Sequence, residues 1–406
     1  MNDHSDISSQ QALDYHELPR PGKISIQPTK PFTTSLDLSL AYTPGVAEPV
    51  RRIHENPENA YRYTNKGNLV AVITDGSAVL GLGRVGALAG KPVMEGKAVL
   101  FKRFADIDVF DIEVNAPSTE AFIETVVNIA PTFGGINLED IAAPACFVIE
   151  QALRDRLEIP IFHDDQHGTA VITCAGLINA LEIQGKRIED VRIVVLGAGA
   201  AGIATSKLLI ARGAMKQNIV MVDSRGVIHT GRDDLNIYKE AFAIDTPLRT
   251  LDEAMLGADV LIGVSGPSLV SKAMVKRMSK RAIVFALSNP DPEIDPADAY
   301  EAKPGSIIAT GRSDYPNQVN NALCFPFIFR GALNARARYI NQSILLAAVD
   351  ALASLAREPV LPEVLEAYGV EQMEFGPDYI LPKQFDPRLF DWVVPKVEEA
   401  ARKQTD

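Results

Sequence analysis

The stretch RIVVLGAGAAGIATSKLLIARGA at residues 192–214 decides the fold. Residues 192–196 are typical of a buried strand, the pattern G-x-G-x-x-G follows at 197–202, and the remainder has the composition of a helix. The next apolar run ends in Asp223, which is 223 − 197 = 26 residues after the first glycine. A ribose-binding acid is expected about 20 residues on, so the whole unit predicts a Rossmann-type dinucleotide site.

In such a unit the pyrophosphate lies on the backbone amides at the start of the helix. The predicted cofactor-binding residues here are Gly197, Gly199, Gly202, Asp223, Ser224 and Arg225. The alternative is that the glycines only permit tight packing between strand and helix.

A second match, GLGRVG at 81–86, lacks this context. The residues after it, GALAGKPVMEGKAVLF (86–101), contain glycine and proline where a helix should begin. We therefore predict a loop whose glycines let the backbone approach a small ligand. A permissive surface turn is the alternative.

Strand-like and helix-like segments alternate along the chain, which indicates an α/β fold with mostly parallel sheets. The expected strands are 69–73, 98–101, 135–138 and 159–162, then 192–196, 218–222, 260–264, 282–287 and 306–310. Expected helices are 118–129, 146–157 and 338–356, and residues 1–35 are expected to form an arm with one short helix. We predict an N-terminal parallel-sheet catalytic domain at 1–164, completed by C-terminal helices at 320–406, and a Rossmann-type domain at 165–319.

Composition excludes several classes of protein. The 406 residues carry a net charge of −12, which argues against nucleic acid or an anionic membrane as partner. No apolar run reaches membrane-span length, and the polar start MNDHSDISSQQ does not resemble a signal peptide. The three cysteines lie far apart in apolar contexts, so we expect buried free thiols and a cytoplasmic location.

Carboxylates follow three strands of the first domain. They are Asp75, Glu139, Asp140, Asp164 and Asp165. Because ligands bind beyond the carboxyl ends of parallel strands, these side chains are expected to converge, and they would repel one another without a cation. Oxygen ligands favour Mg²⁺ or Mn²⁺. The alternative is helix capping, for example by Asp165 for a helix starting near Gly168.

Four other side chains have both a functional and a structural interpretation. His163 and His167 in HDDQH are more typical of hydrogen-bonded residues than of zinc ligands. Lys97 follows the glycine-rich loop; away from water and near a cation its ammonium form would be disfavoured, which suits a general base, although a solvated lysine is the common alternative. Tyr42 in LAYTPGVAEPV is either a proton donor or a half-buried aromatic residue.

Several motifs together resemble one family. SLAYTPGVAEPV, TDGSAVLGLG, MEGKAVLF, INLEDI, FHDDQHGTA, GAGAAG, SNPDPE and PNQVNNALCFPFIFRGAL occur in this order in malic enzymes, particularly the bacterial type. The resemblance covers residues from about 12 to about 395. It implies oxidative decarboxylation of malate to pyruvate and CO₂ with NAD(P)⁺ and a divalent metal.

The resemblance also implies roles for single residues. Tyr42 resembles the general acid and Lys97 the general base, with Asp164 beside Lys97 to tune its proton transfer. The resemblance assigns the metal to Glu139, Asp140 and Asp165. It assigns substrate contacts near the nicotinamide to Asn289 and Asn320.

Some properties stay open at this point. Asp223 favours NAD, whereas Ser224, Arg225 and the run VDSRGVIHTGR are similar to the NADP-preferring type; we expect NADP, with NAD as the alternative. Ser77 and Ala78 stand where animal-type members carry a substrate-binding arginine. We also expect no acyltransferase-like domain and a homodimer or larger assembly.

Three competing functions place different demands on the sequence. A redox-silent oxaloacetate decarboxylase would not need the GAGAAG unit. An amino-acid dehydrogenase would not need the acidic crevice. A dinucleotide-sensing regulator should have lost Lys97 or the carboxylates, and neither is missing.

Overall fold

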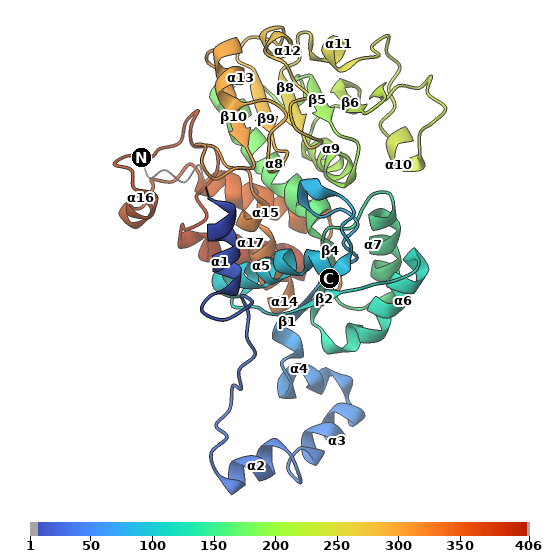
Figure 1. The fold of residues 1–406 in the computed structure, drawn as a ribbon, viewed down its shortest axis with the longest axis vertical. Coiled ribbons are helices and arrows are strands. Elements are labelled where there is room, and N and C mark those ends of the chain that lie inside the picture. The colour runs from blue at the N-terminus through green and yellow to red at the C-terminus, as the bar shows by residue number, and fades with distance from the viewer. Residues whose placement is uncertain (1–6, 404–406) are drawn as a thin grey trace.

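The computed structural model describes residues 7–403. They form two mostly parallel sheets, each packed with helices, that follow one another along the long axis of the molecule (Figure 1). Each sheet together with its helices is called a layer below. The first six and last three residues of the predicted domain ranges lie outside this part. The α/β class, the Rossmann-like second sheet and the C-terminal helices agree with the sequence prediction.

The first sheet has the strand order β2-β1-β3-β4, all parallel. Its strands are β1 (Leu69–Thr74), β2 (Asp108–Glu113), β3 (Gly135–Leu138) and β4 (Ile161–His163). β1 is buried along its whole length because helices cover both faces of the sheet. The carboxyl ends of β1, β3 and β4 therefore meet at one edge.

Helices surround this sheet. They are α5 (Ala87–Ala105), α6 (Thr119–Ile129), α7 (Ala145–Arg156) and α8 (Asp164–Gln184). Residues 83–86 form the predicted loop, but the expectation that no helix begins after residue 86 and the predicted strand at 98–101 were wrong, because both segments fall in α5. Met94, Ala98, Phe101 and Ala105 have helical spacing and are buried, and this burial outweighs the local cost of Pro92.

The second sheet has the order β10-β9-β8-β5-β6-β7, with only β7 antiparallel among the strands described. The strands are β5 (Ile193–Leu196), β6 (Ile219–Asp223), β7 (Gly226–Val227), β8 (Val260–Gly263), β9 (Ile283–Ala286) and β10 (Ile307–Thr310). The accompanying helices are α9 (Ala200–Arg212), α10 (Ile237–Glu240), α11 (Leu251–Met255), α12 (Lys272–Lys276) and α13 (Pro296–Ala302). Each predicted apolar run of this half is a strand.

The C-terminal helices return to the first sheet. They are α14 (Phe325–Asn334), α15 (Gln342–Leu355), α16 (Pro362–Tyr368) and α17 (Arg388–Arg402). Phe325 and Phe329 of α14 pack edge-on against Phe101 of α5 at centroid distances of 4.8 and 5.2 Å. α15 is held to α8, where Asn179 Nδ2 donates to the carbonyl of Ala353 at 3.0 Å. The C-terminal helices thus pack against α5 and α8 and belong to the first layer.

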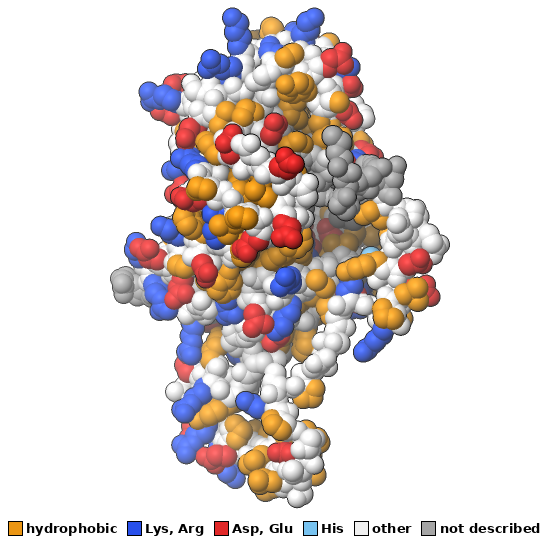
Figure 2. All heavy atoms as spheres, turned by 90° about the vertical axis from the view of Figure 1, so that its left-hand side faces the viewer, with side chains coloured by type: hydrophobic (Ala, Val, Ile, Leu, Met, Phe, Trp, Pro, Cys, Tyr) orange, Lys and Arg blue, Asp and Glu red, His pale blue; other side chains and the backbone are white. Residues whose placement is uncertain are grey.

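The N-terminal segment is only partly packed on the body. Its helices are α1 (Ser9–Glu17), α2 (Ser35–Ala41), α3 (Ala47–Glu55) and α4 (Ala60–Tyr63). Lys23, after α1, donates to the carbonyl of Pro92. α2 and α3 lie at the lower end of the molecule in Figure 1, and hydrophobic side chains are visible at this end in Figure 2.

Short 3-10 helices lie between these elements. They are η1 (Pro57–Asn59), η2 (Lys66–Asn68), η3 (Leu80–Leu82), η4 (Ala130–Thr132), η5 (Lys216–Asn218) and η6 (Asn321–Leu323). The three cysteines are free and buried, as predicted: Cys146, Cys174 and Cys324. Among residues 7–403, no helix has both the length and the apolar character needed to cross a membrane.

Candidate active site

Three carboxylates converge at the shared edge of the first sheet. Glu139 and Asp140 follow β3, and Asp165 lies in the first turn of α8. One oxygen of each lies within 4.8 Å of those of the other two. Asp165 also accepts a hydrogen bond from the backbone N–H of Asp140 at 2.8 Å, which ties the two loops together. An all-oxygen set of this size fits a hard divalent cation.

Lys97 approaches this cluster from the middle of α5. It is only 8% exposed, its Nζ lies 3.1 Å from Glu139 Oε1, and it donates to Asp164. The ring of Phe325 lies against the ammonium at 4.5 Å. The lysine is thus held by two carboxylates and one aromatic face, and the interpretation of a solvated surface lysine does not apply.

The prediction that the ammonium form of Lys97 is disfavoured depends on a divalent cation beside it, and it stays a prediction; the protein groups around Lys97 act in the opposite direction. Burial alone lowers the pKa of Lys97, but the carboxylates of Asp164 and Glu139 outweigh burial and raise that pKa above its ordinary value. Burial raises the pKa of Glu139 well above its ordinary value against the opposing charge of Lys97, and burial raises that of Asp164 likewise. Crowded carboxylates of this kind are stabilised by a further cation.

The remaining strand-end acid has a structural task. Asp75 accepts hydrogen bonds from the backbone and the hydroxyl of Ser77, at 2.9 and 2.5 Å, and so holds the turn after β1. Asp165 does not cap a helix starting near Gly168, because α8 already begins at Asp164. Of the five predicted carboxylates, three form the cluster, one pairs with Lys97 and one shapes the turn.

The two histidines lie outside the cluster. His167 contacts Glu150 at 2.6 Å. His163 is buried at the end of β4, with Nδ1 3.8 Å from Asp165. No histidine belongs to a metal-sized group within residues 7–403. The prediction of a hydrogen-bonded histidine thus holds for His167, whereas neither ring nitrogen of His163 has a hydrogen-bond partner among residues 7–403.

Asn320 and Asn289 lie in the second half of the chain, near segments of the first. Asn320 caps η6 by accepting from the N–H of Ala322, and its neighbour Asn321 lies against Gly168 of α8. Asn289 follows β9 in a loop. A Cβ at Gly81 would lie 2.8 Å from the carbonyl oxygen of Asn289, so the first glycine-rich loop abuts this segment. That glycine permits a close approach between two parts of the protein.

The structure does not bring Tyr42 to the other candidate residues of this chain. Tyr42 ends α2, which lies at the lower end of the molecule in Figure 1, apart from α8 and β4. Its side chain is 68% exposed. The arm that carries Tyr42 projects from the body, and its role as general acid stays a prediction.

The second glycine motif has the geometry of a nucleotide loop. Gly197 has φ +119°, and a Cβ there would lie 2.6 Å from the carbonyl oxygen of Val264. A Cβ at Gly202 would lie 1.9 Å from the carbonyl oxygen of Gly197, so this glycine allows the start of α9 to pack on the turn. Gly199 faces open space. Two glycines serve the fold, and the third leaves room for a ligand at the helix N-terminus.

The acid after β6 is engaged by two cations that the sequence analysis missed. Arg232 donates to both oxygens of Asp223 at 2.8 and 3.1 Å, and Lys239 Nζ lies 2.7 Å from Oδ2. Burial raises the pKa of Asp223, but these hydrogen bonds outweigh it and lower that pKa to about 2. Ser224 and Arg225 are exposed beside it. The only sequence signal for Arg232 and Lys239 was a positive charge within the run after β6.

The relatives of the chain decide its family. Residues 21–120 match the family model "Malic enzyme, N-terminal domain" and residues 166–367 match "Malic enzyme, NAD binding domain". The NADP-dependent malic enzyme of Halomonas elongata is 61% identical over 98% of this chain and 94% of its own length. The chain belongs to the malic enzyme family.

Other malic enzymes extend the comparison. The NADP-dependent malic enzyme of Escherichia coli is 57% identical over 98% of this chain, which spans only 52% of that protein. The crystal structure of the malic enzyme of Pyrococcus horikoshii superposes with a TM-score of 0.88 at 44% identity, covering 98% of this chain and 91% of that one. The two-layer fold is thus the malic enzyme fold.

Proposed function

We propose that this protein catalyses the oxidative decarboxylation of L-malate to pyruvate and CO₂ with reduction of NADP⁺, and that it requires Mg²⁺ or Mn²⁺. The observation that carries the proposal is the burial of Lys97 between Asp164 and Glu139, at the edge of a three-carboxylate cluster. Family membership supports the reaction, and the Gly197–Gly202 turn supports the cofactor.

The residues proposed to hold the metal are Glu139, Asp140 and Asp165. Their fit rests on the convergence of the three oxygens and on the raised pKa of Glu139, since each added negative charge costs free energy in a buried site. A divalent cation supplies Lewis-acid polarisation of the C1 carboxylate and C2 oxygen of malate and stabilises the enolate left by CO₂.

Lys97 and Asp164 are the proposed proton-transfer pair. With a divalent cation beside it, Lys97 would lose its proton more readily, and the neutral amine would accept the proton of the C2 hydroxyl while the hydride leaves for the nicotinamide. Asp164 is fully buried and bonded to Nζ, so it holds the amine in place and shares its proton. Asn289 and Asn320 are the proposed substrate contacts next to the nicotinamide.

Tyr42 is proposed to protonate the enolate at C3 from a second copy of the chain. The support is the exposed apolar surface of the arm that carries Tyr42. Leu36, Leu40 and Val50 on α2 and α3 are 65%, 65% and 59% exposed, an unusual number of bare apolar side chains for one short segment. A homodimer that covers this arm would bring Tyr42 of one chain to Lys97 of the other.

Mixing two inactive variants tests this arrangement. Tyr42→Phe and Lys97→Ala proteins are each expected to be inactive as homodimers. Random re-association gives half heterodimers with one intact site each, so activity should return to about a quarter of the unmixed native level. Recovery of no activity from verified heterodimers would place both residues in the same chain's site and contradict the proposal.

The preference for NADP rests on the charges after β6. Arg232 and Lys239 neutralise Asp223, and the exposed Arg225 adds a guanidinium that suits a 2′-phosphate.

The proposed domain ranges are 1–164 with 320–406 for the catalytic domain and 165–319 for the Rossmann-type domain. A cytoplasmic location is proposed from the three buried free thiols.

The test is NADPH formation from L-malate with Mn²⁺, run in parallel with NAD⁺ and with a chelator. We expect a chelator-sensitive signal matched by pyruvate, with a higher kcat/KM for NADP⁺. Absence of signal with either cofactor would refute the proposed reaction. A higher kcat/KM for NAD⁺ would refute the role given to Arg225.

A further inference from the structure

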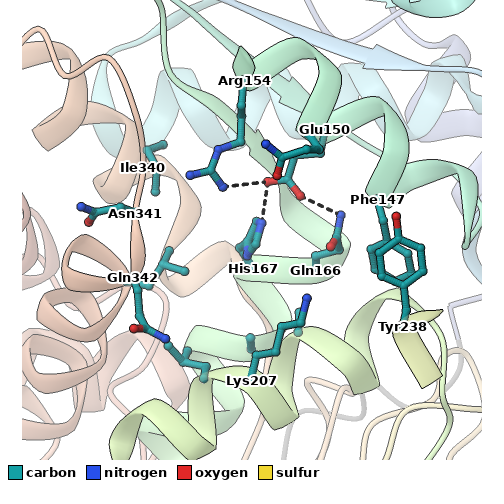
Figure 3. Close-up of a pocket in the computed structure, with 15 residues that line it drawn as sticks. Phe147, Glu150, Arg154, Gln166, His167, Lys207, Tyr238, Ile340, Asn341 and Gln342 are labelled. Carbon is teal, nitrogen blue, oxygen red and sulfur yellow. Dashed lines mark hydrogen bonds and ion pairs between the residues drawn. The ribbon is translucent and has the colours of Figure 1, made fainter. Parts of the chain in front are cut away.

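A cavity of about 500 Å³ lies between the two layers, and two of its lining residues, Gln166 and His167, directly follow Asp165 of the three-carboxylate cluster. Its walls come from α7, α8, α9, α10 and the start of α15 (Figure 3). A volume of this size is typical of small-molecule sites. None of Lys97, Glu139, Asp140 or Asp165 lines it, nor does any glycine of the 197–202 motif.

Two cations from different layers extend toward this space. Arg154 comes from α7 and Lys207 from α9, and Figure 3 shows both side chains directed into the cavity. The guanidinium of Arg154 has Glu150 Oε1 as its charged partner at 3.9 Å, which is beyond hydrogen-bond length. The side chain of Lys207 is exposed and has no ion pair or hydrogen bond with any described residue. Both cations are therefore available to a ligand.

The carboxylate in the cavity is already engaged. Glu150 accepts hydrogen bonds from Gln166 Nε2 at 3.0 Å and contacts His167 Nε2 at 2.6 Å. Burial raises the pKa of Glu150, but His167 and Arg154 outweigh it and the pKa is lowered, so the group is ionised. Its single charge is less than the sum of the two cations, and the cavity keeps a positive balance.

The rest of the wall also suits an anion with an organic part. The 14-residue helix α15 begins at the cavity, with Asn341 as its N-cap and Gln342 as its first residue. The helix dipole favours negative charge at this N-terminus. On the opposite side Phe147 and Tyr238 stack with centroids 4.3 Å apart. Ala170 and Leu208 add apolar surface between them.

We propose that this cavity binds a small phosphorylated metabolite. The phosphate lies between Arg154 and Lys207, and the organic part lies against Phe147 and Tyr238. Such a ligand links α7 of the first layer to α9 of the second, and it contacts His167, two residues after Asp165. The site is separate from the nucleotide turn and from the carboxylate cluster.

Calorimetric titration with inorganic phosphate and with phenyl phosphate, without metal or malate, tests the proposal. We expect both probes to bind, phenyl phosphate more tightly because its ring contacts the aromatic wall. Lys207→Met should weaken both affinities about tenfold or more, since a hydrogen bond to a charged group is lost. Lys216→Met is the matched control, because Lys216 is exposed on the same layer and does not line the cavity. It should bind like the native protein.

Competition distinguishes the site from the cofactor site. Saturating NADP⁺ should leave the phosphate affinity of the native protein unchanged. Displacement of the probes by NADP⁺ would overturn the proposal and assign the cavity to the nucleotide. Failure of both probes to bind, or equal affinities of Lys207→Met and native protein, would also overturn it. These titrations need no turnover, so their result is independent of the proposed reaction.

Discussion

The two G-x-G-x-x-G segments carry the same pattern and lead into helices, yet they are different structures. At 197–202 the turn follows β5, and Gly202 is needed because a Cβ there would lie 1.9 Å from a backbone oxygen. At 81–86, Gly83 and Gly86 have φ +73° and +86° but face open space. The motif at 197–202 is fixed by packing between strand and helix. The motif at 81–86 turns the chain and leads into α5, where Lys97 lies ten positions after the first residue, Ala87.

The largest effect is expected at Lys97, the residue that α5 delivers to the site. Lys97→Ala should lower kcat by about 10³-fold, within the range for loss of a general acid or base. Mn²⁺ affinity should persist, because the three-carboxylate cluster is intact. Steady-state kinetics and Mn²⁺ titration measure the two effects. Lys102→Ala, an exposed position of the same helix, is the control and should keep kcat within about twofold.

Asp165→Asn sharpens the assignment of the metal. The amide oxygen keeps the hydrogen bond to the N–H of Asp140, whereas the charge is lost. Mn²⁺ affinity should fall at least about tenfold, with the melting temperature little changed. Asp75→Asn is the matched control, since that side chain holds a turn through Ser77. Equal Mn²⁺ affinities of the two variants would remove Asp165 from the ligand set.

The elements that could be predicted from the sequence are those whose formation depends on residues close together in the chain. The strands around 197–202 are buried on both faces and were recognisable as apolar runs. The convergence of Glu139, Asp140 and Asp165 was predicted because parallel topology gathers the strand ends, whereas Asp75 does not join them. α5 was missed because Gly90 and Pro92 oppose a helix locally, while the burial of Phe101 against α14 stabilises it from a distance.

Two parts of the site had no local signal at all. The partners of Asp223 lie nine and sixteen residues further along the chain, and only the fold of the loop after β6 brings Arg232 and Lys239 back to it. The raised pKa of Lys97 depends on two carboxylates that are 42 and 67 positions away in the chain (139 − 97 and 164 − 97). The charge balance of a buried group is a property of all its neighbours, so spacing alone could not predict how these two carboxylates act on the pKa of Lys97.

Gly199→Ala distinguishes, within the motif at 197–202, a glycine that leaves room for a ligand from glycines that the fold requires. Gly199 has φ −93°, and a Cβ added there would meet nothing within 4 Å, so alanine should leave the melting temperature within a few degrees of native. The methyl group occupies the space assigned to the pyrophosphate, and KM for NADP⁺ should rise about tenfold. Gly202→Ala should instead lower the melting temperature. An unchanged KM in Gly199→Ala would contradict the placement of the cofactor.

Gly83→Ala carries the smallest expected effect and tests the same comparison from the other side. A Cβ at Gly83 meets nothing within 4 Å, so the only cost is the positive φ, about 1 kcal/mol of stability. KM for NADP⁺ should stay within about twofold, because this motif holds no nucleotide. Gly81→Ala is the informative neighbour: its Cβ would press on the carbonyl of Asn289, so KM for malate should rise a few-fold while KM for NADP⁺ changes less. If Gly83→Ala raised KM for NADP⁺ as strongly as Gly199→Ala, both glycine motifs would have to contact the cofactor.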